Sequence, residues 1–282
     1  MAFLYLAPAL VVYGVFMLFP LVHAAWLSLY KWDGLTLGTF VGLENYRQIV
    51  ADAGLRQAFA HAFVLIVFYA LIQVLIGLLL AAIMNRARVR GLAFFRTVVF
   101  LPQVIAMVVV AVSWRRIYAP DGLLNGVLRA VGLGGVARAW LGDYTFALPA
   151  VGLVGTWVET GLTTVLLLAA MGKISGELFE AARLDGAGAV REFFAVTLPS
   201  VRNELAVAST LTVIAALRTF DLVYVTTRGG PGNTTSVPSF EVYHRAFELN
   251  QVGSAAAIGV ALTVVIFLLS FAINGLAERG RA

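Results

Sequence analysis

Residues Ala58–Met84 read AFAHAFVLIVFYALIQVLIGLLLAAIM, a run that contains no charged side chain. A helix needs about 20 mostly apolar residues to cross the roughly 30 Å of hydrocarbon in a bilayer. The run exceeds that length, and the surface of a soluble domain would interrupt it with charged residues. We therefore predict that this segment is a membrane-spanning helix.

Five further stretches share this apolar character. They are Ala2–Leu29, Thr97–Trp114, Ala147–Met171, Leu205–Val225 and Ala255–Ala277. The first of them lacks a basic start and is longer than the apolar core of a signal peptide, so we expect it to be retained. Together the six stretches predict an all-α integral membrane protein with six transmembrane helices, in a single domain over residues 1–282.

The composition supports a membrane protein and argues against a soluble enzyme. Of the 282 residues, 61% are hydrophobic and only 12% are charged, and the mean hydropathy is +0.91. Soluble domains have roughly a quarter charged residues because their surface must meet water. The net charge of +5 suits a partner made of anionic lipid headgroups, and nothing in the sequence points to nucleic acid.

The orientation can be predicted from one short loop between the second and third stretches. This loop carries Arg86, Arg88, Arg90 and Arg96 and no acidic residue. Short loops rich in arginine and lysine stay on the cytoplasmic side. With six spans, both termini are then expected in the cytoplasm.

Motifs for catalysis, nucleotides and metals are not convincing in this sequence. The segment Met171–Ser175 (MGKIS) resembles the end of a phosphate-binding loop, but Leu167 stands where that loop requires glycine. The three histidines, His23, His61 and His244, have no partner at helical spacing, and there are no cysteines. We predict no catalytic residue, no metal site and no cofactor, and therefore no enzyme.

The loop over residues 173–204 carries the clearest functional signal. Ser175 is a suitable N-cap, followed by acids in the first turns of a short helix that should end near Gly186. A second short helix should place Val190, Phe193 and Phe194 on one side before Pro199. The polar side holds more acids than arginines, which is unlike a lipid-surface helix. We therefore expect this apolar helix corner to bind a protein.

The spacing in this loop resembles that of a known family. The pattern consists of Glu180-Ala181-Ala182, three residues, Gly186, nine residues and Val196-Thr197-Leu198-Pro199. It matches the EAA loop of bacterial ABC-importer permeases, with valine in place of the usual isoleucine. Flanking segments resemble the carbohydrate-uptake branch, which includes sugar and glycerol-phosphate permeases. These are Phe40–Tyr46 (FVGLENY), Phe95–Pro102 (FRTVVFLP), Phe220–Tyr224 (FDLVY) and Gly229–Pro231 (GGP).

The resemblance implies the type I ABC-importer permease fold, a cytoplasmic coupling loop over residues 173–204 and a place in the bacterial plasma membrane. It implies four kinds of partner: a second homologous permease, two ATP-binding subunits, an extracytoplasmic substrate-binding protein and the lipid membrane. The ATPase contacts it implies are Glu180, Ala181, Ala182, Gly186, Leu198 and Pro199.

Matching the family's substrate contacts residue by residue implies a path through the membrane midplane. The matched positions are Gln103, Met107, Gly155, Val158, Glu159, Leu162, Thr212 and Ala216, several of them small or apolar. Polar groups within a span are themselves candidates for function, and an aromatic ring beside hydrogen-bonding groups suits a sugar. These two criteria add Trp157, Thr160 and Arg218 to the candidate path residues. An alternative is that Glu159–Arg218 or Arg218–Asp221 pairs only fix helix packing.

Other classes of membrane protein fit the sequence less well than an importer permease. An ion-gradient-driven secondary transporter is the main alternative, followed by a six-helix channel and a membrane enzyme. Secondary transporters commonly show internal repeats and intramembrane acids, whereas Glu159 is the one clear acid within a predicted span. Arg228–Gly232 (RGGPG) should form an irregular external turn, either a binding-protein contact or a plain connector.

Overall fold

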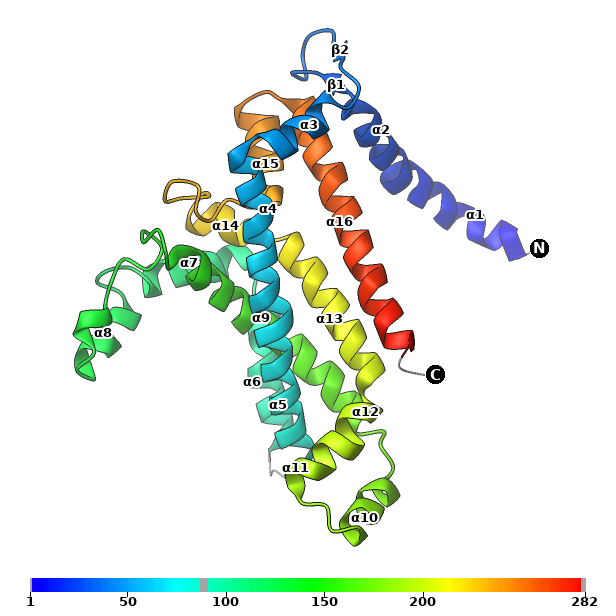
Figure 1. Cartoon of the computed structure of the whole chain (residues 1–282), viewed down its shortest axis with the longest axis vertical. Coiled ribbons are helices and arrows are strands. Elements are labelled where there is room, and N and C mark those ends of the chain that lie inside the picture. The colour runs from blue at the N-terminus through cyan, green and yellow to red at the C-terminus, as the bar shows by residue number, and fades with distance from the viewer. Residues whose placement is uncertain (1, 87–90, 280–282) are drawn as a thin grey trace.

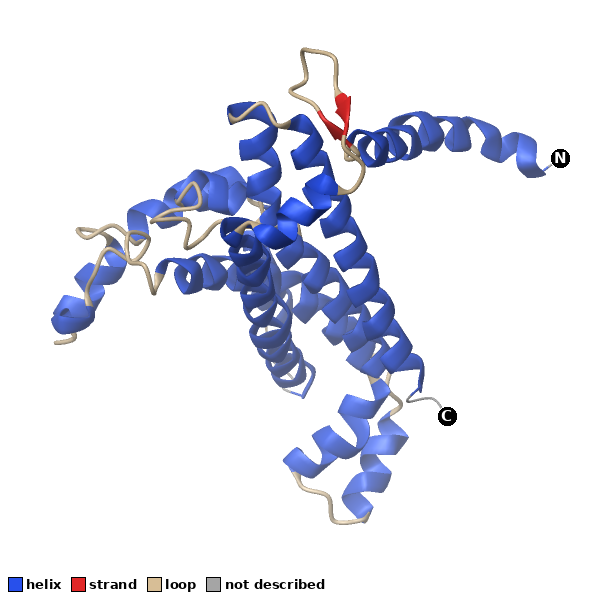
Figure 2. Ribbon diagram, turned by 45° about the horizontal axis from the view of Figure 1, so that its top comes forward, coloured by secondary structure: helices blue, strands red, loops and turns tan. Residues whose placement is uncertain are grey.

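The structure is a computed structural model that describes residues 2–86 and 91–279. It is almost entirely helical, with one small two-stranded sheet among the described residues (Figures 1 and 2). Arg88 and Arg90 of the basic loop lie outside these ranges, so the orientation drawn from that loop stays a prediction.

Four long segments form the bundle (Figure 1). The first combines α4 (Ala53–Ile66), the π-helical turn η2 (Val67–Ile72) and α5 (Gln73–Arg86). The other three are α9 (Ala147–Met171), α13 (Arg202–Leu217) and α16 (Val252–Arg279). Helix α9 is mostly buried and lies at the centre, where α5 and α6 (Leu92–Val104) pack against it. Helix α13 packs against α16 and α4.

Glycines explain how closely α9 is approached by its neighbours. A Cβ at Gly152 would meet the Phe68 ring, and one at Gly155 would overlap the ring of Tyr69. At Gly161 a Cβ would lie 2.8 Å from the Cα of Phe100. Small residues let helices pack backbone to backbone inside a membrane. The glycines of α9 therefore allow this helix to occupy the centre of the bundle.

The described residues contain four helices that are long and apolar enough to cross a membrane: Leu6–Leu27, Ala53–Asn85, Ala147–Met171 and Val252–Leu276. They correspond to the first, second, fourth and sixth predicted spans. The two remaining predicted spans are interrupted, and a count of six spans stays a prediction.

The third predicted span, Thr97–Trp114, is wrong as a single helix. Helices α6 and α7 (Met107–Ile117) meet at a bend of 96°. Ile105 and Ala106 between them have extended backbones, with ψ of 134° and 131°. Extended torsions cannot continue the helical hydrogen-bond ladder. This pair can count as a fifth crossing only if the bent helices act as one span.

The fifth predicted span, Leu205–Val225, is likewise two helices. Helix α13 ends at Leu217, and α14 (Asp221–Thr226) follows after a break in which Phe220 leaves helical torsions (φ −124°, ψ −62°). The 16 residues of α13 are about 24 Å long at 1.5 Å per residue, which is shorter than the hydrocarbon core.

The N-terminal segment forms an arm that leaves the bundle (Figure 1). It comprises α1 (Ala2–Tyr13), the π-helical turn η1 (Gly14–Leu18) and α2 (Phe19–Leu27). None of its apolar stretch is buried within the chain, and its base reaches the bundle through contacts between α2 and α16.

One end of the bundle, here called the hairpin end, carries short elements around the arm's base (Figure 1). Strands β1 (Tyr30–Lys31) and β2 (Thr39–Phe40) pair antiparallel, followed by α3 (Glu44–Ala51). The Asn45 amide donates hydrogen bonds to the carbonyls of Ser28 (2.7 Å) and Tyr30 (2.9 Å). The family-like segment Phe40–Tyr46 thus ties the arm to α3.

The remaining elements complete both ends. The hairpin end and its flank hold α8 (Leu123–Ala130), η3 (Gly134–Val136), α14, α15 (Pro238–Tyr243) and η5 (His244–Glu248). The opposite end holds α10 (Gly176–Leu184), α11 (Ala189–Glu192), the π-helical turn η4 (Phe193–Thr197) and α12 (Leu198–Ser200) (Figures 1 and 2). We call the segment from Ser175 to Ser200 the knob.

Candidate functional site

The knob begins as the sequence predicts. The Ser175 hydroxyl accepts a hydrogen bond from the Glu177 N–H at 3.3 Å, which caps the start of α10. Helix α10 ends in a Schellman motif, with the Gly186 N–H bonded to the Arg183 carbonyl (3.0 Å) and the Ala187 N–H to the Ala182 carbonyl (2.9 Å). Gly186 has φ +76°, a conformation that favours glycine. The N-cap and the glycine corner are confirmed.

The tip of the knob presents apolar side chains to its surroundings. Large exposed side chains on it are Leu178, Leu184, Val190 and Phe194, and Leu184 is 89% exposed. Glu180, Ala181 and Gly186 are exposed beside them, and Ala182 is half-buried. An exposed apolar patch of this kind is typical of a protein–protein contact.

The base of the knob is anchored in the bundle. Leu198 and Phe193 pack against a buried cluster that includes Met171 at the end of α9 and Val201 before α13. Pro199 lies in α12, which continues the helical turns of α11 and η4 without a break. The predicted contact residues therefore divide into an exposed tip, Glu180 to Gly186, and a base at Leu198 and Pro199.

The predicted path residues do not all share one surface. Thr160 and Thr212 are buried, and their hydroxyls donate to the carbonyls of Thr156 (2.6 Å) and Ser209 (3.0 Å) in their own helices. Gly155, Val158 and Ala216 are buried in the same core. In this structure these positions pack helices together.

Trp157 and Glu159 are the path residues that reach the surface of α9. Trp157 is 42% exposed. Its ring lies edge-on to the ring of Trp114 of α7, with the two ring centroids 5.5 Å apart. Glu159 is half-buried, and no ion pair joins it to Arg218, which like Glu159 lies in the described part of the chain. Arg218 and Asp221 are exposed, and neither forms an ion pair with another described residue. The packing-pair alternative has no support here.

Two glutamines carry buried polar atoms near this surface. The Oε1 atom of Gln103, a predicted path residue at the end of α6, is buried and has no hydrogen-bond partner among the described residues. Gln73, which the sequence reasoning missed, is fully buried and donates to the Glu159 carbonyl (2.8 Å) and the Thr163 hydroxyl (2.7 Å). A lone amide in the middle of an apolar run was the available signal.

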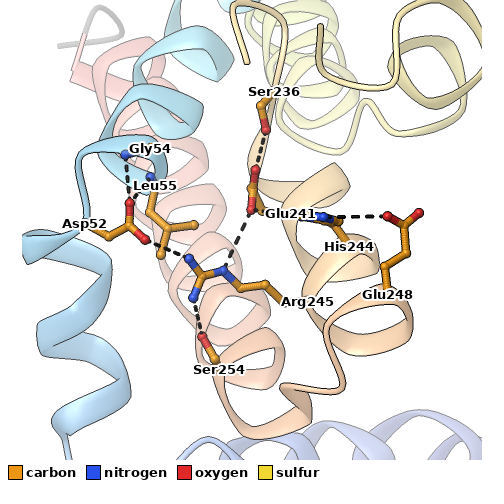
Figure 3. Close-up of polar contacts among 9 residues, drawn as sticks. All are labelled: Asp52, Gly54, Leu55, Ser236, Glu241, His244, Arg245, Glu248 and Ser254. Atoms are coloured by element: carbon orange, nitrogen blue, oxygen red, sulfur yellow. Dashed lines mark hydrogen bonds and ion pairs between the residues drawn. The ribbon is translucent and has the colours of Figure 1, made fainter. Parts of the chain in front are cut away.

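At the hairpin end a polar network joins segments that are far apart in sequence (Figure 3). Arg245 contacts Asp52 at 2.8 Å, the Ser254 hydroxyl at 3.0 Å and Glu241 at 3.8 Å. Asp52 also accepts hydrogen bonds from the N–H groups of Gly54 (2.8 Å) and Leu55 at the start of α4. Arg245 therefore links α4, α15 and α16. Because 193 residues separate Asp52 from Arg245, no sequence pattern could have indicated this contact.

This network predicts a loss of stability in acid. Burial alone would raise the pKa of Asp52, but the N–H groups of Leu55 and Gly54 and the Arg245 guanidinium outweigh it and hold the pKa below the usual 3.8. A depressed folded-state pKa contributes stability above the unfolded pKa, and that stability is lost as the pH falls through the folded value. Melting of the purified protein should therefore show a smaller drop below about pH 4 for Asp52→Asn than for the wild type. Identical pH profiles would contradict this role of Asp52.

The turn at Arg228–Gly232 is an ordered structure. The Thr235 hydroxyl donates to the Thr227 hydroxyl (2.7 Å) and the Gly230 carbonyl (2.8 Å). Gly229 has φ +81°, and a Cβ there would meet Phe240 at 2.9 Å. The turn is irregular, as predicted, and it is fixed against α15.

Comparison with known proteins gives a consistent result. The pattern of the family described as "Binding-protein-dependent transport system inner membrane component" matches residues 73–281. The chain is 39% identical over 271 residues to a probable ABC transporter permease protein, YurN, of Bacillus subtilis, covering 95% of this chain and 92% of the relative. It is 34% identical to the diacetylchitobiose uptake system permease protein NgcF of Streptomyces coelicolor, covering 98% and 82%.

A solved structure shares the fold. It is a bacterial alginate ABC transporter in complex with an alginate pentasaccharide-bound periplasmic protein. The likeness has a TM-score of 0.85 at 21% identity and covers 99% of this chain and 94% of the matched chain. The relatives are permeases rather than enzymes, in agreement with the sequence prediction.

Proposed function

The chain belongs to the binding-protein-dependent transport system inner membrane components, and from this premise we propose that it is a permease subunit of an ABC importer for a sugar or sugar-like solute. The observation that carries the substrate class is the near full-length similarity to a diacetylchitobiose permease. The proposed subunit spans the bacterial plasma membrane several times, with both termini in the cytoplasm.

The knob is the proposed docking site for the ATPase. Its exposed tip combines small residues at Ala181 and Gly186 with apolar side chains, so another protein can approach the backbone closely. Two ATP-binding subunits would serve the complex, one on this knob and one on the equivalent knob of a second permease. Closure of the ATPase pair would move both knobs as rigid bodies and switch the path between inward-facing and outward-facing states.

A second permease would cover the arm and complete the exposed surface of α9. Among the described residues, none of the apolar stretch Leu6–Leu27 of the arm is buried, and the exposed Trp157 and half-buried Glu159 would line a path completed by the partner subunit. Buried polar groups within membranes favour such a water-filled path. Substrate would arrive from an extracytoplasmic binding protein at the hairpin end.

The role of Glu159 can be tested by Glu159→Gln, which removes charge and preserves shape. Because no described residue forms an ion pair with Glu159, thermal stability should stay at the wild-type value. Loss of a charged hydrogen bond to substrate should weaken the apparent transport affinity by about tenfold. Asp121→Asn, in an exposed pair with Arg116, is the matched control. Lower stability with unchanged affinity would indicate a packing residue instead.

The substrate class is tested by the ligand that the cognate binding protein retains on purification, identified by mass spectrometry. We expect an oligosaccharide or related polyol, and uptake of that labelled compound should be lost when the gene for this chain is deleted. An amino acid, peptide or metal ion as the retained ligand would contradict the carbohydrate assignment.

A further inference from the structure

We propose that the ion pair between Arg183 and Glu192 is an internal brace that makes the two halves of the knob move as one body. The two residues are then positioning residues for coupling, additional to the predicted contact residues. The inference rests on the proposed function of the knob as the ATPase docking site.

The pair closes the glycine corner from the inside. Arg183 lies in the last turn of α10 and Glu192 at the end of α11, on either side of the turn at Gly186. The Arg183 Nε donates to Glu192 Oε2 at 3.0 Å. The Glu192 side chain is only 6% exposed, whereas that of Arg183 is 59% exposed.

Burial separates this pair from ordinary surface ion pairs. Two exposed charges gain little by pairing because water and salt screen them. A carboxylate that is nearly out of water is screened much less, so its contact with an arginine is stronger than the contact within an exposed pair. The Arg183–Glu192 contact therefore resists opening of the corner.

The path from the tip to the bundle explains why the corner must be rigid. Helix α10 contacts α11 and η4, and η4 continues through α12 to the fully buried Val201 at the start of α13. Between the knob and the ends of α5 and α9 lies a cavity of about 230 Å³, whose wall includes Asn85, Phe179, Arg183 and Glu192. Close packing transmits displacement, and among the described residues α10 has the cavity rather than close packing on this side.

A hinge at Gly186 would therefore let α10 tilt into the cavity when the ATPase pushes on it. The displacement of α10 would then not be passed on to α13. With the brace closed, α10 and α11 keep their relative orientation, and movement of the tip reaches the membrane helices through η4 and α12.

The test compares variants in proteoliposomes that contain this chain with its partner permease, ATPase and binding protein, using the sugar retained by that binding protein. Arg183→Met should lower the ratio of sugar transported to ATP hydrolysed by about fivefold or more, the lower end of typical coupling energies. Arg191→Met removes a neighbouring exposed arginine and should keep the wild-type ratio. An unchanged ratio in Arg183→Met would overturn the brace.

A covalent brace separates rigidity from general damage. Because the chain has no cysteine, Arg183→Cys/Glu192→Cys can be bridged by a short bifunctional thiol reagent in a complex with cysteine-free partners. The unbridged variant should be uncoupled and the bridged one restored toward the wild-type ratio. Continued uncoupling after bridging, or thiols that cannot be bridged, would overturn the proposal. Absence of ATP-driven uptake in the wild type would instead overturn the proposed function itself.

Discussion

Gly186→Asp should abolish uptake while leaving the chain folded in the membrane. Gly186 has φ +76°, and an L-residue forced into this region costs roughly 1–2 kcal/mol, which opposes the Schellman turn that ends α10. The new carboxylate would also lie on the exposed tip, where burial against the ATPase would leave it desolvated. Uptake and co-purification of the ATPase should both fall, with normal amounts of permease in the membrane.

Matched variants separate the two causes. Gly188→Asp places the same charge two residues away, at a position with ordinary extended torsions (φ −73°, ψ 174°) and open space around the Cβ, and should be milder. Gly186→Asn tolerates the left-handed region about as well as Gly186→Asp does but adds no charge, so it should retain more activity, and the difference measures the effect of the charge. Wild-type uptake by Gly186→Asp would remove the knob from the coupling mechanism.

Gly155→Ala should destabilise the fold strongly. The added Cβ would overlap the Cζ and Oη atoms of Tyr69, whose ring is buried between η2 and α9. Inserting a carbon into such a site typically costs about 1–3 kcal/mol because side chains or helices must shift. The variant should melt at a lower temperature and reach the membrane in smaller amounts.

A control and a rescue accompany this prediction. Gly275→Ala adds the same carbon to α16, where no described atom lies within 4 Å, and should not lower the melting temperature, since alanine favours a helix more than glycine does. Adding Tyr69→Leu to Gly155→Ala shortens the side chain that is overlapped and should recover part of the lost stability. If Gly155→Ala melts like the wild type, α9 and η2 do not pack as closely as described.

The long spans and the knob were predictable from sequence because each depends on local chemistry. Long, mostly apolar runs mark Ala58–Met84 and Ala147–Met171, and Ser175 and Gly186 are residue types that start and end helices. The break at Ile105–Ala106 was not predictable from composition. The residues on both sides of it are apolar, and hydrophobicity carries no information on the direction of the backbone.

The candidate path was predictable only in part. Mid-span polarity drew attention to Glu159, which stays a candidate, but it did not distinguish threonines that bond their own helix, such as Thr160, from groups that would face a path. The Arg245–Asp52 link depends on how the chain folds back on itself. The brace combines a local turn with the burial of Glu192, and burial is visible only in the folded knob.

The most direct test of the account is the energy source of transport. Proteoliposomes containing this chain, its partner permease and the ATPase would be supplied with binding protein and labelled diacetylchitobiose, maltose or lactose, with or without ATP and with or without imposed proton or sodium gradients. The account predicts that uptake of at least one sugar requires both ATP and the binding protein and persists when the ion gradients are collapsed. Uptake driven by an ion gradient in the absence of ATP would contradict it.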